Sequence, residues 1–302
     1  MLDVLSRAAS FIAIILLGFL LKKIGFFKDS DFPLLSKITI RITLPAAIIV
    51  NFAGKQINPG MLGLGLLGLG GGLLYVVLGF LLNRDASKEQ RAFEMLNLAG
   101  YNIGTFVLPF AQNFLGTTGV IATSLFDTGN SVICLGGAYS LAAMVKDGLG
   151  FSAKRILKAL ATSVPFVTYV IMVTMNLVRI PIPGVVLSCA EIIANANAFM
   201  AMLMIGVGFK LQGNRSQFRV IGKMLVVRYG VAALLAFVYY FVLPLDLEVR
   251  QALVILAFSP IGSAVPGFTN ELKGDVGLSS ALNSITMVIS IVIIISLLSI
   301  ML

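Results

Sequence analysis

The sequence predicts an all-α polytopic membrane protein with ten transmembrane helices. Three observations lead to this fold class: an apolar composition, apolar runs of spanning length, and basic residues concentrated in alternate connections. Apolar residues make up 58% of the 302 positions, the mean hydropathy is +1.01, and only 12% of the residues are charged. Soluble domains carry about 25% charged residues, so a soluble fold could not cover this much apolar side chain with polar surface.

A helix needs roughly 20 mainly apolar residues to cross the hydrocarbon layer of a bilayer. On this measure we expect ten spans: 4–22, 36–54, 59–82, 92–112, 117–144, 153–178, 184–209, 217–243, 249–271 and 277–301. The connections between them are short. Lys22 and Lys23 follow the first apolar run, whereas the basic residues of a cleavable signal peptide precede its apolar run, so we expect the first run to remain as a helix.

Lysine and arginine are distributed unevenly between the two sides of this arrangement. Most of the 22 lie in or beside the connections after the first, third, fifth, seventh and ninth spans. The positive-inside rule places that side in the cytoplasm, so we expect a protein of the cell membrane with both termini outside. The net charge of +9 then reflects basic cytoplasmic loops, and no nucleic-acid partner is expected.

The composition also excludes several kinds of site. The chain has no histidine, and Cys134 and Cys189 lie far apart in apolar runs, so we expect no metal site and no redox motif. The segment 63–68 fits GxGxxG but lies in an apolar span, without the strand–turn–helix context of a dinucleotide site. We therefore expect no catalytic residue and no cofactor, and the source of energy for any active process would be an ion gradient, a partner or a solute gradient.

The two halves of the chain, 1–150 and 151–302, each contain five of the expected spans. Because five is odd, the second half must enter the membrane in the opposite orientation. Ordered local matches recur at a nearly constant offset, for example Asn102-Ile103-Gly104-Thr105 with Pro260-Ile261-Gly262-Ser263 and, further along, Asp127 with Asn283. The sequence therefore predicts two inverted five-helix repeats.

Both repeats carry proline and glycine within their fourth helix. Proline removes a backbone donor, glycine weakens a helix, and freed backbone groups are tolerated at membrane depth only against protein or a polar cavity. Paired breaks of this kind mark the centre of secondary transporters, where half-helix ends face the charge of a solute. Two separately kinked structural helices are the alternative. The residues expected to bind solute are Asn102, Gly104, Thr105, Pro109, Pro260, Gly262, Ser263 and Pro266.

Polar side chains of neighbouring spans are candidates for an ion-coupling or supporting role. They are Asp127, Asn130, Asn283, Asn195, Arg41 and Asn51. Asp127 lies well inside an apolar span and three residues from Asn130, so the two share a helix face. A buried acid there can carry a proton, hold a cation such as sodium, or make a structural hydrogen bond. Arg41 could attract an anion, although a snorkelling or structurally paired arginine is the alternative.

Several segments resemble bacterial members of the auxin efflux carrier family, over essentially the whole chain. These are LPAAIIVNFAG, NLAGYNIGTFVLPFAQNFLGTTGVIATSLFDTGNSVI and SPIGSAVPGFTNELKGDVGLSSALNSITMVIS. The resemblance implies a fold similar to bile acid:sodium symporters, with the fourth and ninth helices crossing at their breaks. It implies transport of small organic anions, auxin in plant members and malate or malonate-like dicarboxylates in bacterial ones, and a possible homodimer.

By position, this resemblance assigns the family's asparagine to Asn102 and its acid and amide to Asp127 and Asn130. Many members have two consecutive prolines in the second break, whereas this chain has Pro260 followed later by Pro266. We expect a secondary carrier in which spans 3–5 and 8–10 form a transport bundle that moves against a scaffold of spans 1, 2, 6 and 7. The expected partners are the organic anion and the lipid bilayer. A channel and a membrane sensor that retains a transporter fold are the alternatives.

Overall fold

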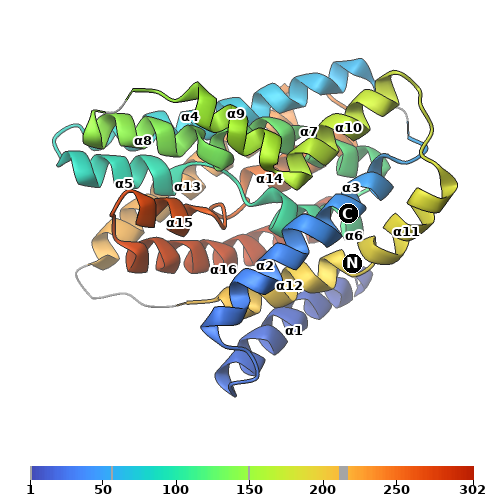
Figure 1. Ribbon diagram of the computed structural model, residues 1–302, viewed down its shortest axis with the longest axis horizontal. Helices are drawn as coiled ribbons and strands as arrows, with labels where there is room; N and C mark the ends of the chain where they lie inside the picture. Colours follow the sequence, from blue (N-terminus) through green and yellow to red (C-terminus); the bar gives the residue numbers. More distant parts are fainter. Residues whose placement is uncertain (1, 56, 149, 211–216) are drawn as a thin grey trace.

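A computed structural model describes residues 2–55, 57–148, 150–210 and 217–302, and every regular element among them is helical. The helices pack into one bundle, with the two chain ends lying toward the same end of it (Figure 1). Within the described residues, six helical segments are long and apolar enough to cross a membrane, or seven if the bent pair Ala153–Thr162 and Val164–Leu177 forms one span. The prediction of an all-helical membrane protein is confirmed.

The helical segments follow the ranges that hydropathy indicated. The first half contains α1 (Leu2–Lys23), α2 (Phe32–Ile38), α3 (Leu44–Phe52), α4 (Leu64–Leu81), α5 (Lys88–Leu98), α6 (Leu108–Phe114), α7 (Thr117–Val132) and α8 (Ala138–Asp147). The second half contains α9 (Ala153–Thr162), α10 (Val164–Leu177), α11 (Gly184–Ala194), α12 (Asn197–Gly208), α13 (Phe218–Phe237), α14 (Leu247–Ala257), α15 (Val265–Glu271) and α16 (Val276–Met301). A short π-helical turn joins α2 to α3 (Thr39–Thr43), whereas the segment that joins α7 to α8 (Ile133–Gly137) is kinked at Gly136, whose φ is +146°.

The ranges 92–112 and 249–271 each contain an interrupted helix, as their prolines and glycines predicted. After α5 ends at Leu98, helical backbone resumes at Ile103, and between α14 and α15 the chain forms turns and irregular backbone. Gly100 in the first gap has a φ of +76°, a left-handed conformation that glycine adopts without steric cost. We call 99–102 the first interruption and 258–264 the second interruption.

Two other ranges that we expected as single helices are also divided. The range 153–178 bends by 77° between α9 and α10. Ser163 caps α10 by accepting a hydrogen bond from the Phe166 amide at 3.4 Å, and Pro165 lies in the first turn, so a new helix starts there. The range 184–209 divides into α11 and α12 at a short turn around Asn195.

The helices pack into two groups with close contacts inside each group. In one group α1 packs against α12, and α3 packs against α10 and α11. In the other, α4 packs against α5 and α7, α5 against α8, α14 against α7 and α13, and α15 against α16. The groups meet where α9 contacts the segment between α7 and α8, where α3 and α10 contact α7, and where α1 contacts α16. Both interruptions belong to the second group.

An ion pair between a partly exposed lysine and a buried carboxylate joins α13 to α5. The Lys223 Nζ lies 3.0 Å from Oε2 of Glu94, whose side chain is 1% exposed. Asn83 Nδ2 donates to the same oxygen at 2.8 Å. Replacing Lys223 by methionine leaves the carboxylate buried without its cation. Removing one partner of a buried pair costs roughly 3–5 kcal/mol of stability, and we expect the lower end because the Lys223 side chain is partly exposed.

Adding Glu94→Gln to Lys223→Met is expected to recover most of this loss, since the amide removes the buried charge and keeps the hydrogen bond from Asn83. The thermal unfolding midpoint of the purified protein in detergent measures both effects. Equal midpoints for the single and the double variant would contradict the structural role of this pair.

Candidate functional site

The two interruptions lie directly against each other. The Asn102 backbone N–H donates to the Pro260 carbonyl oxygen at 3.0 Å, and both residues are buried. This hydrogen bond joins two segments that are far apart in the sequence. It brings together the two residue sets from which solute binding was expected.

Asn130 of α7 holds the first interruption through its side-chain amide. Its Oδ1 accepts from the Tyr101 backbone N–H at 3.0 Å, and its Nδ2 donates to the Tyr101 carbonyl at 2.9 Å. The same Nδ2 donates to Oδ1 of Asp127 at 2.8 Å. One side chain thus satisfies both backbone polar groups of a residue that has left the helix, which buried backbone requires.

Asp127 is buried and connects the two helix groups. The Tyr169 hydroxyl of α10 donates to its Oδ2 at 3.2 Å. In the described part of the chain, no lysine or arginine lies within ion-pair distance of this carboxyl group. A lone ionised acid at membrane depth is unfavourable, so the environment suits either a protonated acid or a carboxylate beside a bound cation.

Asn283 of α16 occupies the corresponding place at the second interruption. Its Nδ2 donates to the carbonyls of Ile261 at 3.0 Å and Gly262 at 3.1 Å. The hydroxyl oxygen of Thr286 accepts from the Ile261 backbone N–H at 3.3 Å. Each interruption is therefore braced by an asparagine from a neighbouring helix that follows it in the sequence.

Two cavities flank the second interruption, and Ser263 and Ala264 line both. The smaller one, of about 140 Å³, lies between the interruptions, α7 and the bend between α9 and α10. Its polar lining is Tyr101, Asn102, Thr105, Asp127, Asn130, Ser131, Ser163 and Ser263. The larger one, of about 340 Å³, lies between α2, α12, the second interruption and α16. Its polar and charged lining is Asp29, Lys210, Ser263, Ser280, Asn283 and Ser284.

Asn102, which lines the smaller cavity, has an unsatisfied hydrogen-bond donor. Its Oδ1 accepts from the Thr105 hydroxyl at 2.5 Å, but its buried Nδ2 has no hydrogen-bond partner among the described residues. Leaving a buried donor unsatisfied costs about 1–3 kcal/mol. The amide is therefore a ready donor to an acceptor that enters this cavity.

Three of the four remaining residues expected to bind solute line one of these cavities, and the fourth does not. Gly104 and Gly262 line the smaller cavity, and Pro266 lines the larger one. Gly104 also allows close packing, because a Cβ there would lie 2.6 Å from a Leu44 methyl group. Pro109 lies buried in the first turn of α6 and lines neither cavity.

Three of the residues expected in a supporting role lie away from the interruptions. Arg41 is exposed in the π-helical turn between α2 and α3, and Asn195 is exposed in the turn between α11 and α12. Asn51 accepts from Gln112 Nε2 at 3.1 Å and lines a separate cavity of about 310 Å³. The asparagine of α12 that is buried is Asn197, whose Oδ1 accepts from the Thr43 hydroxyl at 3.0 Å.

Arg228 of α13 is the residue at this site that the sequence analysis missed. Its guanidinium donates to main-chain carbonyls of both interrupted helices: Leu98 at 2.6 Å, Gly100 at 2.9 Å and Ser259 at 2.7 Å. The signal that could have found it is an arginine inside an otherwise apolar span, which is by itself a candidate functional residue.

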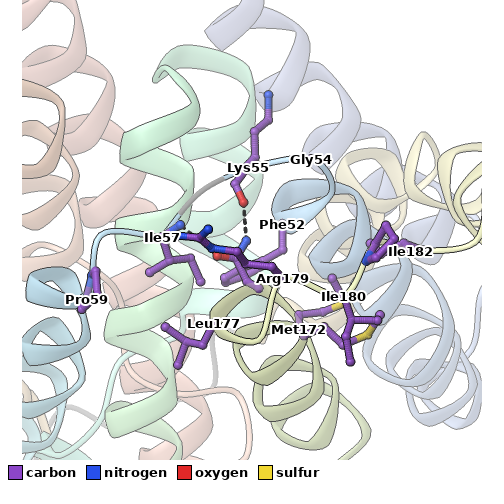
Figure 2. A pocket seen from close by; sticks show the side chains of 13 residues that line it. Phe52, Gly54, Lys55, Ile57, Pro59, Met172, Leu177, Arg179, Ile180 and Ile182 are labelled. Atoms are coloured by element: carbon purple, nitrogen blue, oxygen red, sulfur yellow. Dashed lines mark hydrogen bonds between the residues drawn. The ribbon is translucent and has the colours of Figure 1, made fainter.

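A further cavity, of about 360 Å³, lies between the segment after α3 and the end of α10 (Figure 2). Asn176 fastens that segment: its Oδ1 accepts from the Ile57 N–H at 2.9 Å, and its Nδ2 donates to the Lys55 carbonyl. Lys55 and Arg179 line it over apolar side chains such as Phe52. None of the residues expected at the site lines this cavity, so it stands apart from the interruptions.

Comparison with known proteins gives one result. A family model described as membrane transport protein matches residues 3–298, a range that includes both interruptions and every residue discussed for the site. No curated protein matches the chain.

Proposed function

This chain belongs to the membrane transport protein family, that of the auxin efflux carriers, and from that premise we propose that it is a secondary carrier of small organic anions. The solutes would be auxin-like acids or dicarboxylates such as malate or malonate. The observation that carries the proposal is the buried, unpartnered Nδ2 of Asn102, a residue that lines the cavity between the two interruptions. A carboxylate oxygen that accepts from this group would satisfy it.

The proposed architecture has ten transmembrane helices in two inverted repeats, 1–150 and 151–302. The fourth span, of α5 and α6, crosses the ninth, of α14 and α15, where Asn102 donates to Pro260. The similar roles of Asn130 and Asn283 support the repeat, because each braces one interruption. The two packing groups support a scaffold of spans 1, 2, 6 and 7 and a transport bundle of spans 3–5 and 8–10.

In the proposed mechanism, alternating access moves the transport bundle against the scaffold around the bound anion. Asn102, Gly104, Thr105, Gly262 and Ser263 contact the carboxylate, and Pro109, Pro260 and Pro266 shape the interrupted segments around it. The Tyr169–Asp127 hydrogen bond joins scaffold to bundle and would change when they move. A proton or a sodium ion at Asp127 is the proposed coupling ion, Asn130 and Asn283 give support, and no cofactor is required.

The positive-inside pattern supports a location in the cell membrane with both termini outside, and the proposed partners are lipid and the organic anion. A homodimer is part of the same proposal. The proposal gives no role at the interruptions to Arg41, Asn51 or Asn195. Arg41 and Asn195 are exposed, and Asn51 is hydrogen-bonded to Gln112.

Uptake of labelled malonate, malate and an auxin-like aromatic acid into proteoliposomes tests this function. We expect saturable uptake and counterflow for at least one of them. Asn102→Ala is expected to lower uptake efficiency, Vmax/KM, about 10- to 100-fold, because the amide donor to the solute is lost. Asn113→Ala, a variant of the same interrupted span outside both cavities, should stay within about twofold of the parent. Absence of saturable uptake for every acid would end the carrier proposal, and currents without counterflow would identify a channel.

Asp127→Asn is expected to remove the dependence of uptake on the coupling ion. The amide does not take up a proton at the pH values of the assay, and it carries no charge to balance a cation. The measurement is the initial uptake rate at two pH values, with and without sodium, in parent and variant. If the variant kept the parent's pH and sodium dependence, Asp127 would have no coupling role, while the carrier proposal would stand.

A further inference from the structure

Arg228 is a buried cation inside a span of the bundle. It lies in the segment Phe218–Val242, which is long and apolar enough to cross a membrane. Arg228 is only 1% exposed. No aspartate or glutamate of the described residues lies within ion-pair distance of it. Its charge is instead met by three main-chain carbonyls.

These carbonyls belong to the ends of two helices. Leu98 is the last residue of α5, Gly100 follows in the first interruption, and Ser259 lies two residues after the end of α14. The last carbonyls of a helix have no partner within it and carry the negative end of its dipole. Two such ends converge here, so a cation between them stabilises both.

The shape of the guanidinium suits this position. Nη1 donates to Leu98, whereas Nη2 donates to both Gly100 and Ser259, so one planar group reaches both interruptions. The aromatic rings of Tyr75 and Tyr101 have their centres 5.1 and 5.7 Å from Cζ, a distance at which a ring face attracts a cation. The Tyr75 hydroxyl also donates to the Arg228 carbonyl at 2.9 Å.

We propose that Arg228 is a positioning residue that fastens the ends of both interrupted helices to α13, so that the two interruptions move as one unit. It lines neither cavity at the interruptions, and it acts on Asn102 through the backbone at Gly100. The fastening itself rests on these contacts alone. Its effect on transport rests on the proposed function.

Hydrogen–deuterium exchange of the purified protein in nanodiscs tests the fastening without any solute. Arg228→Ala is expected to speed amide exchange at least about tenfold in peptides that cover 99–107 and 258–265, because the hydrogen bond between Asn102 and Pro260 then opens more often. Arg219→Ala is the matched control, an exposed arginine near the start of the same helix, and should leave both peptides at parental rates. Parental exchange in both peptides of Arg228→Ala would overturn the proposal.

Adding guanidinium ion to Arg228→Ala shows whether faster exchange comes from the missing side-chain group or from a general loss of fold. We expect it to fill the space left in Arg228→Ala and to slow exchange again in both peptides, whereas ammonium at the same concentration should not. Failure of guanidinium to restore either peptide would overturn the proposal. If Arg228→Ala does not fold, Arg228→Lys serves instead, since a single ammonium cannot fork to both helix ends. That variant should exchange faster in at least one interruption, and parental rates in both would overturn the proposal.

Uptake per folded carrier is the second readout. Arg228→Ala should transport at least about tenfold more slowly, and guanidinium should restore a large part of the rate. Parental uptake by a variant whose interruptions exchange faster would overturn the link to transport. If the parent takes up no acid, the proposed function fails, while the exchange measurements still decide whether Arg228 holds the interruptions.

Discussion

Replacing Asn130 by aspartate is expected to abolish uptake and to destabilise the protein. Aspartate can still accept from the Tyr101 N–H, but it loses both donations made by Nδ2, to the Tyr101 carbonyl and to Asp127. It also puts a second acid at hydrogen-bond distance from Asp127, and two such groups cannot both ionise. The loss of both donations together with this repulsion costs several kcal/mol, so we expect uptake to fall about 100-fold or more.

The rate of uptake per folded carrier and the unfolding midpoint measure this effect. Lower pH should partly restore both, because a protonated aspartate regains one donor. Asn113→Asp is the matched control: Asn113 donates to the Pro109 carbonyl within its own helix segment, away from the cavities, and the effect of its replacement should be small. Parental uptake by Asn130→Asp would show that the amide does not hold the first interruption.

Gly129→Ala is expected to have the largest effect on folding. A Cβ at this position would lie 1.7 Å from the Gly65 carbonyl oxygen and 2.9 Å from the Leu69 nitrogen. Both are backbone atoms of α4, so the clash can be relieved only by separating α4 from α7. We expect a loss of about 3 kcal/mol or more, the upper range for overpacking, with little monodisperse protein recovered.

Gly70→Ala provides the control on the same helix. A Cβ there meets no atom within 4 Å, so the variant should match the parent or gain slightly from the helix propensity of alanine. Purification yield and unfolding midpoint compare the two variants. A midpoint for Gly129→Ala equal to that of Gly70→Ala would contradict the close approach of α4 and α7. Since Asn130 follows Gly129, this approach also sets the position of the amide at the first interruption.

The helical segments and both interruptions could be predicted because they depend on local chemistry. A bilayer demands apolar runs of fixed length, and proline and glycine weaken a helix wherever they lie. The bend at Ser163 was missed because a capping serine and a proline in a first turn also occur within kinked but continuous spans. Length and hydropathy do not distinguish these two cases.

The sequence did not allow us to predict which side of each helix faces the protein interior and which faces lipid. Lipid is as apolar as a protein core, so the pattern of polar residues indicates orientation only weakly in a spanning helix. Asn195 and Asn197 are two residues apart, yet the first is exposed and the second is fully buried against Thr43. Arg41 and Arg228 both lie in apolar spans, yet only Arg228 reaches the interruptions. The partners of Arg228 are backbone carbonyls, which no side-chain pattern reveals.

The position of Ser263 and Ala264 between the two cavities has a pharmacological consequence. Because these two residues line both cavities, a compound bound in the larger cavity would contact the same stretch of chain that faces the smaller one. A blocker of the proposed transport could therefore be sought by its fit to the 340 Å³ cavity, without resemblance to an organic acid.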